Sequence, residues 1–239
     1  MTALRSIVFN VFFFAVTGLS SIVVGMPALL LPRRFAAFAI RIWARTVLGA
    51  LRWTVGLDWE LRGDARALAR PGVLAVKHQS TWDTIVFFAI ASDPAYVLKK
   101  ELLLIPFYGW VSIKAGMIGV DRGKGGAAIR AMTKGAKRAI ADGRQVVIFP
   151  QGTRVAPGAA VPYHPGVAAL YGQLDVPVTP VALNSGLFWG RRSFVKRPGR
   201  IVVEILPPIP PGLDRKTFMT TLETAIETAS ARLAAEAAR

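Results

Sequence analysis

Two side chains that could move a proton, His78 and Asp83, lie five positions apart. A histidine beside a carboxylate is a common general base, because the carboxylate fixes the imidazole tautomer and stabilises the imidazolium once it forms. On one continuous helix the two residues would lie about 140° apart around the axis and could not meet. The pair therefore predicts a loop at His78 and a helix whose first turn holds Asp83, with Ser80 as its N-cap. A structural histidine beside an ordinary helix cap is the alternative.

Two arginines, Arg122 and Arg154, each follow a short apolar run and a turn. Open α/β sheets bind ligands beyond the carboxyl ends of their strands. A guanidinium can hold a phosphate through two parallel hydrogen bonds. Each arginine alone would more simply be a solvated surface residue, but together with the His78 loop they predict a phosphate site.

Short apolar runs alternate with helical segments from Leu57 onward. This alternation predicts an α/β domain over residues 56–239, with a mixed, largely parallel sheet flanked by helices. The predicted strands are Val73–Val76, Ala95–Leu98, Met117–Val120, Gln145–Phe149, Val178–Leu183 and Ile201–Leu206. The predicted helices begin near Thr81, Gly125 and Gly166, and a last one runs from Asp214 to Ala238.

Residues 6–32 carry no charged side chain. Such a stretch is long enough to span a bilayer, which needs about 20 residues. A re-entrant or interfacial helix also fits, because polar, glycine and proline residues interrupt the stretch at Asn10, Gly18, Gly25, Pro27 and Pro32. A cleaved signal peptide is disfavoured, since the apolar region is too long and no convincing small-residue cleavage site follows. Residues 1–55 are therefore predicted to form a membrane-associated helical element.

The segment from Arg33 to Trp53 is typical of an amphipathic helix. Four arginines form a stripe on one side, at positions 34, 41, 45 and 52, and apolar residues occupy the other. Either this helix packs its apolar face on the core, or it lies at the lipid boundary with its arginines at anionic headgroups. We favour the membrane interpretation because the helix directly follows the apolar stretch. The arginine excess also predicts an active domain on the cytoplasmic side of the inner membrane.

The overall composition combines 53% hydrophobic residues with a net charge of +16, from 30 basic and 14 acidic residues. This disfavours disorder and points to an anionic membrane surface, a phosphorylated substrate, or both. Nucleic acid is a disfavoured partner, because the basic residues form neither a tail nor an aromatic-interleaved strip. The absence of cysteine excludes disulfides, thiolate metal sites and a cysteine nucleophile, and two histidines make a histidine-rich metal centre improbable.

Between Leu74 and Leu206 the chain resembles the lysophospholipid acyltransferase family, typified by 1-acyl-sn-glycerol-3-phosphate acyltransferase. Five blocks in the family's order carry the resemblance. They are the His-x4-Asp pair at His78 and Asp83, Lys100 to Trp110, Gly116 to Arg122, Phe149 to Arg154, and Val176 to Val181.

The resemblance implies direct acyl transfer without an acyl-enzyme, with His78 as the base and Asp83 as the residue that orients it. Arg122 and Arg154 would hold the acceptor phosphate, while Gly152 and Thr153 would shape the turn or donate backbone hydrogen bonds. It implies no cofactor and no metal. The co-substrate would be a thioester of coenzyme A or of acyl carrier protein, and membrane lipids would supply the lysophospholipid acceptor.

One departure is Gln151, because the family usually has a glutamate there. Glutamine keeps the acceptor carbonyl but loses the charge, so it could bind the acceptor but could not act as a base. Lysophosphatidic acid, acylated at its sn-2 hydroxyl, is the first expected acceptor. Gln151 keeps open a different lyso-lipid, with a larger headgroup or a lyso-ornithine lipid. A non-catalytic lipid-binding protein is the third hypothesis, but lipid binding would require neither His78 nor Asp83.

Overall fold

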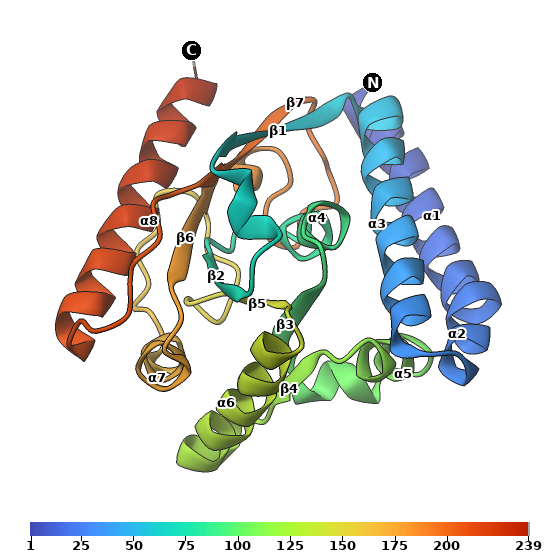
Figure 1. Cartoon of the computed structure of the whole chain (residues 1–239). Coiled ribbons are helices and arrows are strands. Elements are labelled where there is room, and N and C mark those ends of the chain that lie inside the picture. Colours follow the sequence, from blue (N-terminus) through green and yellow to red (C-terminus); the bar gives the residue numbers. More distant parts are fainter. Residues whose placement is uncertain (239) are drawn as a thin grey trace.

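Seven strands form one sheet in the computed structural model, which describes residues 1–238, and their order is β1-β7-β6-β2-β5-β3-β4 (Figure 1). All neighbouring pairs are parallel except β6 and β7, which are antiparallel. The predicted mixed, largely parallel sheet is therefore confirmed. The strands are β1 (Leu57–Gly63), β2 (Gly72–Val76), β3 (Pro94–Lys99), β4 (Ile118–Val120), β5 (Gln145–Ile148), β6 (Val178–Leu183) and β7 (Gly199–Ile205).

The central strands are continuous apolar runs because helices cover both faces of the sheet. On one face, Leu74 and Val76 of β2 share a core with helices α3 (Arg33–Val55) and α4 (Asp83–Ile90). On the other, Val73 and Ala75 pack with residues of α6 (Gly125–Ala141), α7 (Pro165–Leu174) and α8 (Arg215–Ala237). Successive side chains of β2 point to opposite faces of the sheet, so the core is divided between two layers of helices.

Two elements were not predicted from the sequence. Strand β1 lies at the edge of the sheet and pairs with β7 alone. Its alternate residues are charged, and Glu60 and Arg62 form an ion pair on one side of the strand. Helix α5 (Tyr108–Lys114) is the other, and it is only seven residues long.

The N-terminal element is a helical pair, which consists of α1 (Thr2–Ser20) with its continuation α2 (Met26–Leu30) and of α3 packed beside them (Figure 1). Helix α1 continues through a π-helical turn, Ser21–Gly25, into α2. Pro27 lacks the N–H of a regular helical bond and its ring crowds the preceding turn, which accounts for the wider turn just before it. The stretch Thr2–Leu30 is one helix long and apolar enough to cross a membrane, with a mean hydropathy of 2.3 and 6% of its most apolar window buried.

The helical pair shares its core with the α/β part of the chain. Phe9 and Leu51, both fully buried, belong to the same cluster as Trp82 beside the His78 loop. The predicted boundary near residue 55 coincides with the end of α3 at Val55, but one core crosses it. The helical pair is therefore packed into the core of the folded domain.

Polar residues within the apolar stretch connect it to a distant loop. Ser6 Oγ accepts a hydrogen bond from the Lys196 backbone N–H at 2.9 Å, and Asn10 Nδ2 donates to the Phe194 carbonyl at 3.1 Å. The Lys196 ammonium also contacts the Asn10 amide oxygen and lies 4.7 Å from the Trp189 ring centroid. These contacts fix the first half of α1 against the loop between β6 and β7.

The arginine stripe of α3 serves two purposes. Arg41 donates to the carbonyls of Ala91 and Ser92, and Arg52 pairs with Asp58 at 3.3 Å. These two arginines therefore bind the protein, although Arg52 is still exposed, and Arg34 and Arg45 are exposed as well. The outer side of the same helix also exposes apolar side chains, namely Phe35, Phe38, Ile42 and Trp53.

The shared core predicts that α1 stabilises the α/β domain. Phe9 meets the Trp189 ring edge-on at 5.5 Å, so Phe9→Ala should cost about 3–5 kcal/mol. In a chain of this size that lowers Tm by roughly 10 °C. The matched control is Phe14→Ala in the same helix, where the side chain is 71% exposed. Thermal unfolding of both variants in one detergent checks this, and equal Tm values would mean that α1 is not packed on the domain.

Candidate active site

The Asp83 carboxylate organises the loop between β2 and α4. Its Oδ2 atom accepts the backbone N–H groups of Gln79 at 2.6 Å and Ser80 at 2.8 Å, and lies 3.0 Å from His78 Nδ1. Regular helix begins at Asp83, and the Trp82 N–H donates to Ser80 Oγ at 3.1 Å. The loop at His78 and the first-turn position of Asp83 are as predicted, but the N-cap residue is Trp82, so the prediction of Ser80 as the N-cap is wrong. Ser80 Oγ instead accepts a bond in the turn just before the helix, where the chain is not yet helical. In the tautomer that donates Nδ1–H to Asp83, the Nε2 atom of His78 can accept a proton.

The imidazole is held from the opposite side by the segment after β5. The His78 ring stacks on Phe149 at a centroid distance of 4.0 Å, and the His78 carbonyl accepts the Val155 N–H at 2.8 Å. Only 11% of the His78 side chain is exposed. The ring therefore has a fixed position at the end of the sheet.

Gln151 lies behind the wall of the site. Its side chain is 1% exposed, and its Oε1 atom accepts the His78 backbone N–H at 3.1 Å. Its Nε2 atom is buried without a hydrogen-bond partner among residues 1–238. The contact with His78 requires only an acceptor oxygen, which glutamine and glutamate both provide.

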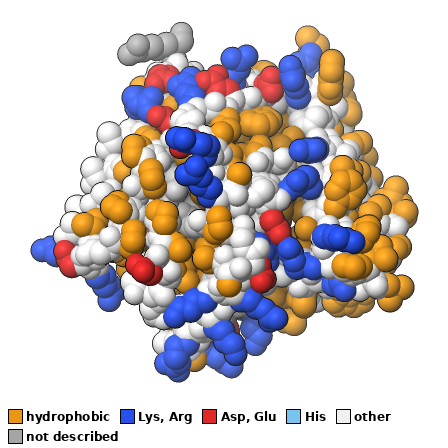
Figure 2. Space-filling view, in the orientation of Figure 1, with side chains coloured by type: hydrophobic (Ala, Val, Ile, Leu, Met, Phe, Trp, Pro, Cys, Tyr) orange, Lys and Arg blue, Asp and Glu red, His pale blue; other side chains and the backbone are white. Residues whose placement is uncertain are grey.

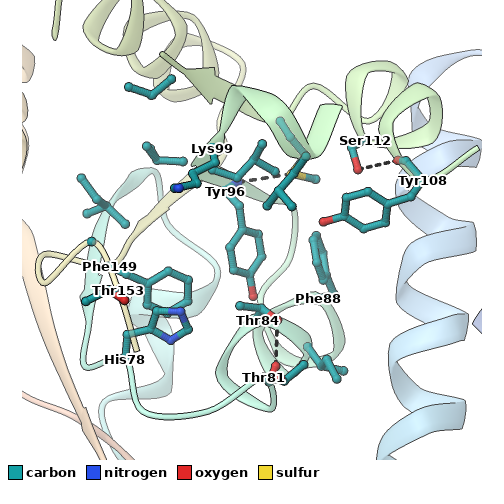
Figure 3. Close-up of a pocket in the computed structure, with 18 of the residues that line it drawn as sticks. His78, Thr81, Thr84, Phe88, Tyr96, Lys99, Tyr108, Ser112, Phe149 and Thr153 are labelled. Atoms are coloured by element: carbon teal, nitrogen blue, oxygen red, sulfur yellow. Dashed lines mark hydrogen bonds between the residues drawn. The ribbon is translucent and has the colours of Figure 1, made fainter. Parts of the chain in front are cut away.

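A cavity of about 730 Å³ opens in front of His78 (Figure 3). His78 and the Thr153 turn form one end, whereas the opposite end is walled by α1 and α3, with Phe13, Ile40 and Trp43. The volume lies within the range of about 300–1,000 Å³ that is usual for ligand sites. A long apolar ligand can therefore extend from the imidazole to the helical pair.

Both predicted phosphate-binding arginines line this cavity. Arg122 Nη1 donates to the Gly152 carbonyl at 2.5 Å, and Arg154 Nη1 donates to Thr81 Oγ1 at 2.7 Å. Each bond uses one of the five N–H groups of a guanidinium, so each arginine retains donors for an anion. The cavity thus combines a histidine, two cations and an apolar end.

Gly152 allows the turn to pass close to the His164 ring. Its φ is +63°, and a Cβ atom there would lie 2.6 Å from the His164 ring, so a side chain would be both strained and crowded. Of the residues predicted for the site, the structure brings His78, Arg122, Gly152, Thr153 and Arg154 to the cavity surface, while Asp83 and Gln151 lie behind it.

The structure adds two residues that the sequence reasoning did not assign to the site. Lys99 projects into the cavity from the end of β3 (Figure 3). Its position after a predicted strand was a usable signal, the same one that identified the two arginines. Tyr96 also lines the cavity, and its hydroxyl has no partner among residues 1–238. Burial, and to a lesser extent the Asp83 carboxyl, raises the pKa of Tyr96, which keeps the hydroxyl as a donor.

Within residues 1–238, no group of three or more histidine, cysteine, aspartate or glutamate side chains is arranged to hold a metal ion.

Comparison with known proteins identifies the family. A family model described as Acyltransferase matches residues 59–184, so the chain belongs to that family and the resemblance seen in the sequence is confirmed. It is similar to the 1-acyl-sn-glycerol-3-phosphate acyltransferase of Pseudomonas aeruginosa, with 34% identity over 71% of this chain and 66% of that protein. The enzyme of the same name from Saccharomyces cerevisiae is 30% identical over 70% of this chain and 57% of its own length. The matched region spans less than two thirds of both relatives.

The fold has a solved counterpart. The crystal structure of the 1-acyl-sn-glycerophosphate acyltransferase PlsC from Thermotoga maritima superimposes with a TM-score of 0.80 and covers 98% of each chain. The sequence identity is 18%, so this likeness establishes the fold. It includes the N-terminal helices, because the superposition extends over almost the whole chain.

Removing the base should abolish turnover without unfolding the protein. We expect His78→Ala to lower kcat by at least about 100-fold, since general-base catalysis contributes 10²–10⁴. Asp83→Asn should lower kcat nearly as much, because an amide cannot stabilise an imidazolium. Initial rates at saturating substrates, with circular dichroism as the folding control, check this. A His78→Ala variant that kept more than a few per cent of the wild-type rate would show that another group is the base.

Proposed function

We propose that this chain transfers a fatty acyl group from a thioester donor to the sn-2 hydroxyl of lysophosphatidic acid, giving phosphatidic acid in phospholipid biosynthesis. The observation that carries the proposal is one cavity containing His78 Nε2, the two arginines and a long apolar end. The names of the relatives from Pseudomonas aeruginosa and Saccharomyces cerevisiae support the same acceptor.

The proposed reaction is a direct displacement. His78 Nε2 takes the proton of the acceptor hydroxyl as that oxygen attacks the thioester carbonyl, and the C–O bond forms. The tetrahedral intermediate then collapses, the C–S bond breaks, and the imidazolium returns its proton to the leaving thiolate. Asp83 keeps the imidazole aligned throughout, through its contact with Nδ1. The chain contains no cysteine, which agrees with a transfer that forms no thioester on the enzyme.

Arg122 and Arg154 position the acceptor in this proposal. A phosphate held by two guanidinium groups fixes the distance from the headgroup to the free hydroxyl, and such positioning lowers the entropic barrier. Lys99 adds a third positive charge at the same cavity. The acyl chain of the donor, carried by coenzyme A or acyl carrier protein, would occupy the apolar end toward α1 and α3.

The main reason to consider other acceptors was the missing charge at Gln151. Gln151 faces the His78 backbone and lies outside the cavity surface, so the missing charge does not contact the acceptor. A protein that only binds lipid would not need the buried Asp83 carboxylate beside a histidine at the cavity wall.

Binding of the acceptor should depend on the two arginines more than binding of the donor does. A hydrogen bond to a charged group contributes about 1.5–3 kcal/mol, so Arg154→Ala should raise the KM for lysophosphatidic acid roughly 10- to 100-fold. The matched control is Arg130→Ala, an exposed arginine of α6 that is not part of the cavity wall.

Steady-state kinetics with each substrate varied separately would distinguish the two effects, and monoacylglycerol provides an acceptor without the phosphate. If Arg154→Ala instead raised the KM for the thioester and left the acceptor unchanged, the phosphate assignment would be wrong. No turnover with any lyso-lipid would refute the proposed function itself.

We further propose that the helical pair lies in the interface of the cytoplasmic membrane and does not cross it. The pair runs along the side of the domain and contacts it at both ends (Figure 1). Ser6 binds the Lys196 backbone near one end, and Ala28 packs against Val111 of α5 at the other. An upright span would therefore carry the charged surface of the domain into hydrocarbon, which is costly.

Exposed apolar side chains gather on the lipid-facing side of this arrangement. They extend over the right of the molecule, where α1 and α3 lie (Figure 2). The segment around α5 exposes more of them, including Leu104 at 72%, Trp110 at 44% and Ile113 at 56%. The cytoplasmic side is supported by the arginine excess that follows the apolar stretch.

Labels along α1 can separate the two orientations, because a chain without cysteine accepts single-cysteine variants cleanly. Leu4→Cys, Val11→Cys and Leu19→Cys should report similar, shallow depths in anionic vesicles when labelled with a fluorophore and quenched by lipids of known depth. A helix that crosses the bilayer would spread Leu4 and Leu19 over roughly 20 Å. Leu213→Cys, an exposed apolar site just before α8, is the control and should not be quenched.

A further inference from the structure

A serine that follows the neighbouring strand of the sheet completes the contacts of Asp83. Ser185 follows the end of β6, and its Oγ atom donates to Asp83 Oδ1 at 2.5 Å. Neither residue is exposed. The other carboxylate oxygen, Oδ2, takes the two backbone N–H groups and the contact with His78. Both oxygens of Asp83 are therefore engaged, each by different partners.

Ser185 reaches Asp83 because of the sheet order. Strand β6 is the parallel neighbour of β2, with Val181 beside Val76, so the segments that follow the two strands emerge at the same edge. The match to the family model ends at residue 184, just before this serine. No local pattern around Ser185 indicates the contact, which depends on residues 102 positions apart.

The segment that carries Ser185 is itself held firmly. The Asn184 side chain accepts the Val202 N–H at 2.9 Å and donates to the Leu233 carbonyl at 3.3 Å, which connects it to β7 and α8. On the other side, the Gly186 N–H donates to Gln79 Oε1 at 3.0 Å. Gln79 thus binds Asp83 with its backbone and the Ser185 segment with its side chain. The serine hydroxyl is positioned by two elements of the scaffold and by the catalytic loop.

We propose that Ser185 is a positioning residue that acts on His78 through Asp83. Because a carboxylate has no hydrogen to give, the hydroxyl must donate, and a donor on Oδ1 fixes the rotation of the carboxylate that keeps Oδ2 opposite Nδ1. The same bond draws negative charge away from the oxygen that faces the imidazole. Ser185 therefore sets both the orientation of His78 and its affinity for the proton. This inference rests on the proposed acyl transfer for its kinetic consequences.

Ser185→Ala should act on kcat and on the pH profile. Without the donor the carboxylate attracts the imidazolium proton more strongly, so the acidic limb of kcat/KM should move upward by about half a pH unit, as a bond of about 0.7 kcal/mol would produce. We expect kcat to fall at least about tenfold and both KM values to stay within about twofold. Ser185→Thr, which keeps a hydroxyl, should recover most of the loss.

The matched control is Ser230→Ala in α8. Ser230 is also buried, at 5% exposure, and its hydroxyl has no partner among residues 1–238. This variant loses the same atom from the same half of the protein without touching Asp83. An unchanged pH profile in Ser185→Ala, or an equal shift in Ser230→Ala, would overturn the inference.

Proton titration of His78 by NMR separates this inference from the proposed function. The chain has two histidines, so the His78 signals can be assigned by comparison with His78→Ala. The midpoint for His78 should rise in Ser185→Ala and stay unchanged in Ser230→Ala, whether or not lysophosphatidic acid is the acceptor. An unmoved midpoint in an active enzyme would refute the role of Ser185, whereas a moved midpoint without any acyl transfer would refute only the function.

Discussion

The active-site geometry depends on satisfying one buried carboxylate. Asp83 has no exposed surface, and a carboxyl group removed from water is unfavourable unless hydrogen bonds replace the lost hydration. Its partners come from two places, the loop after β2 and the segment after β6. Those places meet only when the two strands are parallel neighbours. The position of His78 is thus coupled to the order of the strands, and the site forms together with the sheet.

A second buried charge supports the same loop from the other face of the sheet. Lys77, next to the base and 2% exposed, places its Nζ atom 2.5 Å from Glu227 of α8. Tyr163 also donates to Glu227, and burial raises the pKa of Tyr163, which keeps that hydroxyl protonated. Breaking such a pair leaves an uncompensated charge on Lys77, so the C-terminal helix helps to fix the end of β2. The residue before His78 is therefore held by α8 and the residue after it by Asp83.

The sequence predicted the features that local physics determines. Six of the strands are apolar runs that need no partner to be recognised, and the His78 loop follows from helix geometry at Asp83. Strand β1 was missed because its burial depends on β7, more than 130 residues away. Helix α5 was missed because it is short and because it follows Phe107. The φ of Phe107 is +63°, a backbone conformation that the residue type does not predict. The sequence identifies the side chain of Gln151 as a hydrogen-bond acceptor, but only the fold shows that its oxygen faces the backbone N–H of His78.

The cavity wall that α1 and α3 form has a consequence for how such proteins diverge. Trp43 and Phe13 bound the space opposite His78, and the same helices carry the exposed apolar surface. Membrane attachment and substrate fit, as proposed, thus depend on the same stretch of chain and are inherited together. A hybrid that exchanges the first 55 residues with those of a relative would acquire that relative's far wall along with its anchor. A lineage that adapts these helices to a different bilayer therefore also reshapes the room available to the acyl chain.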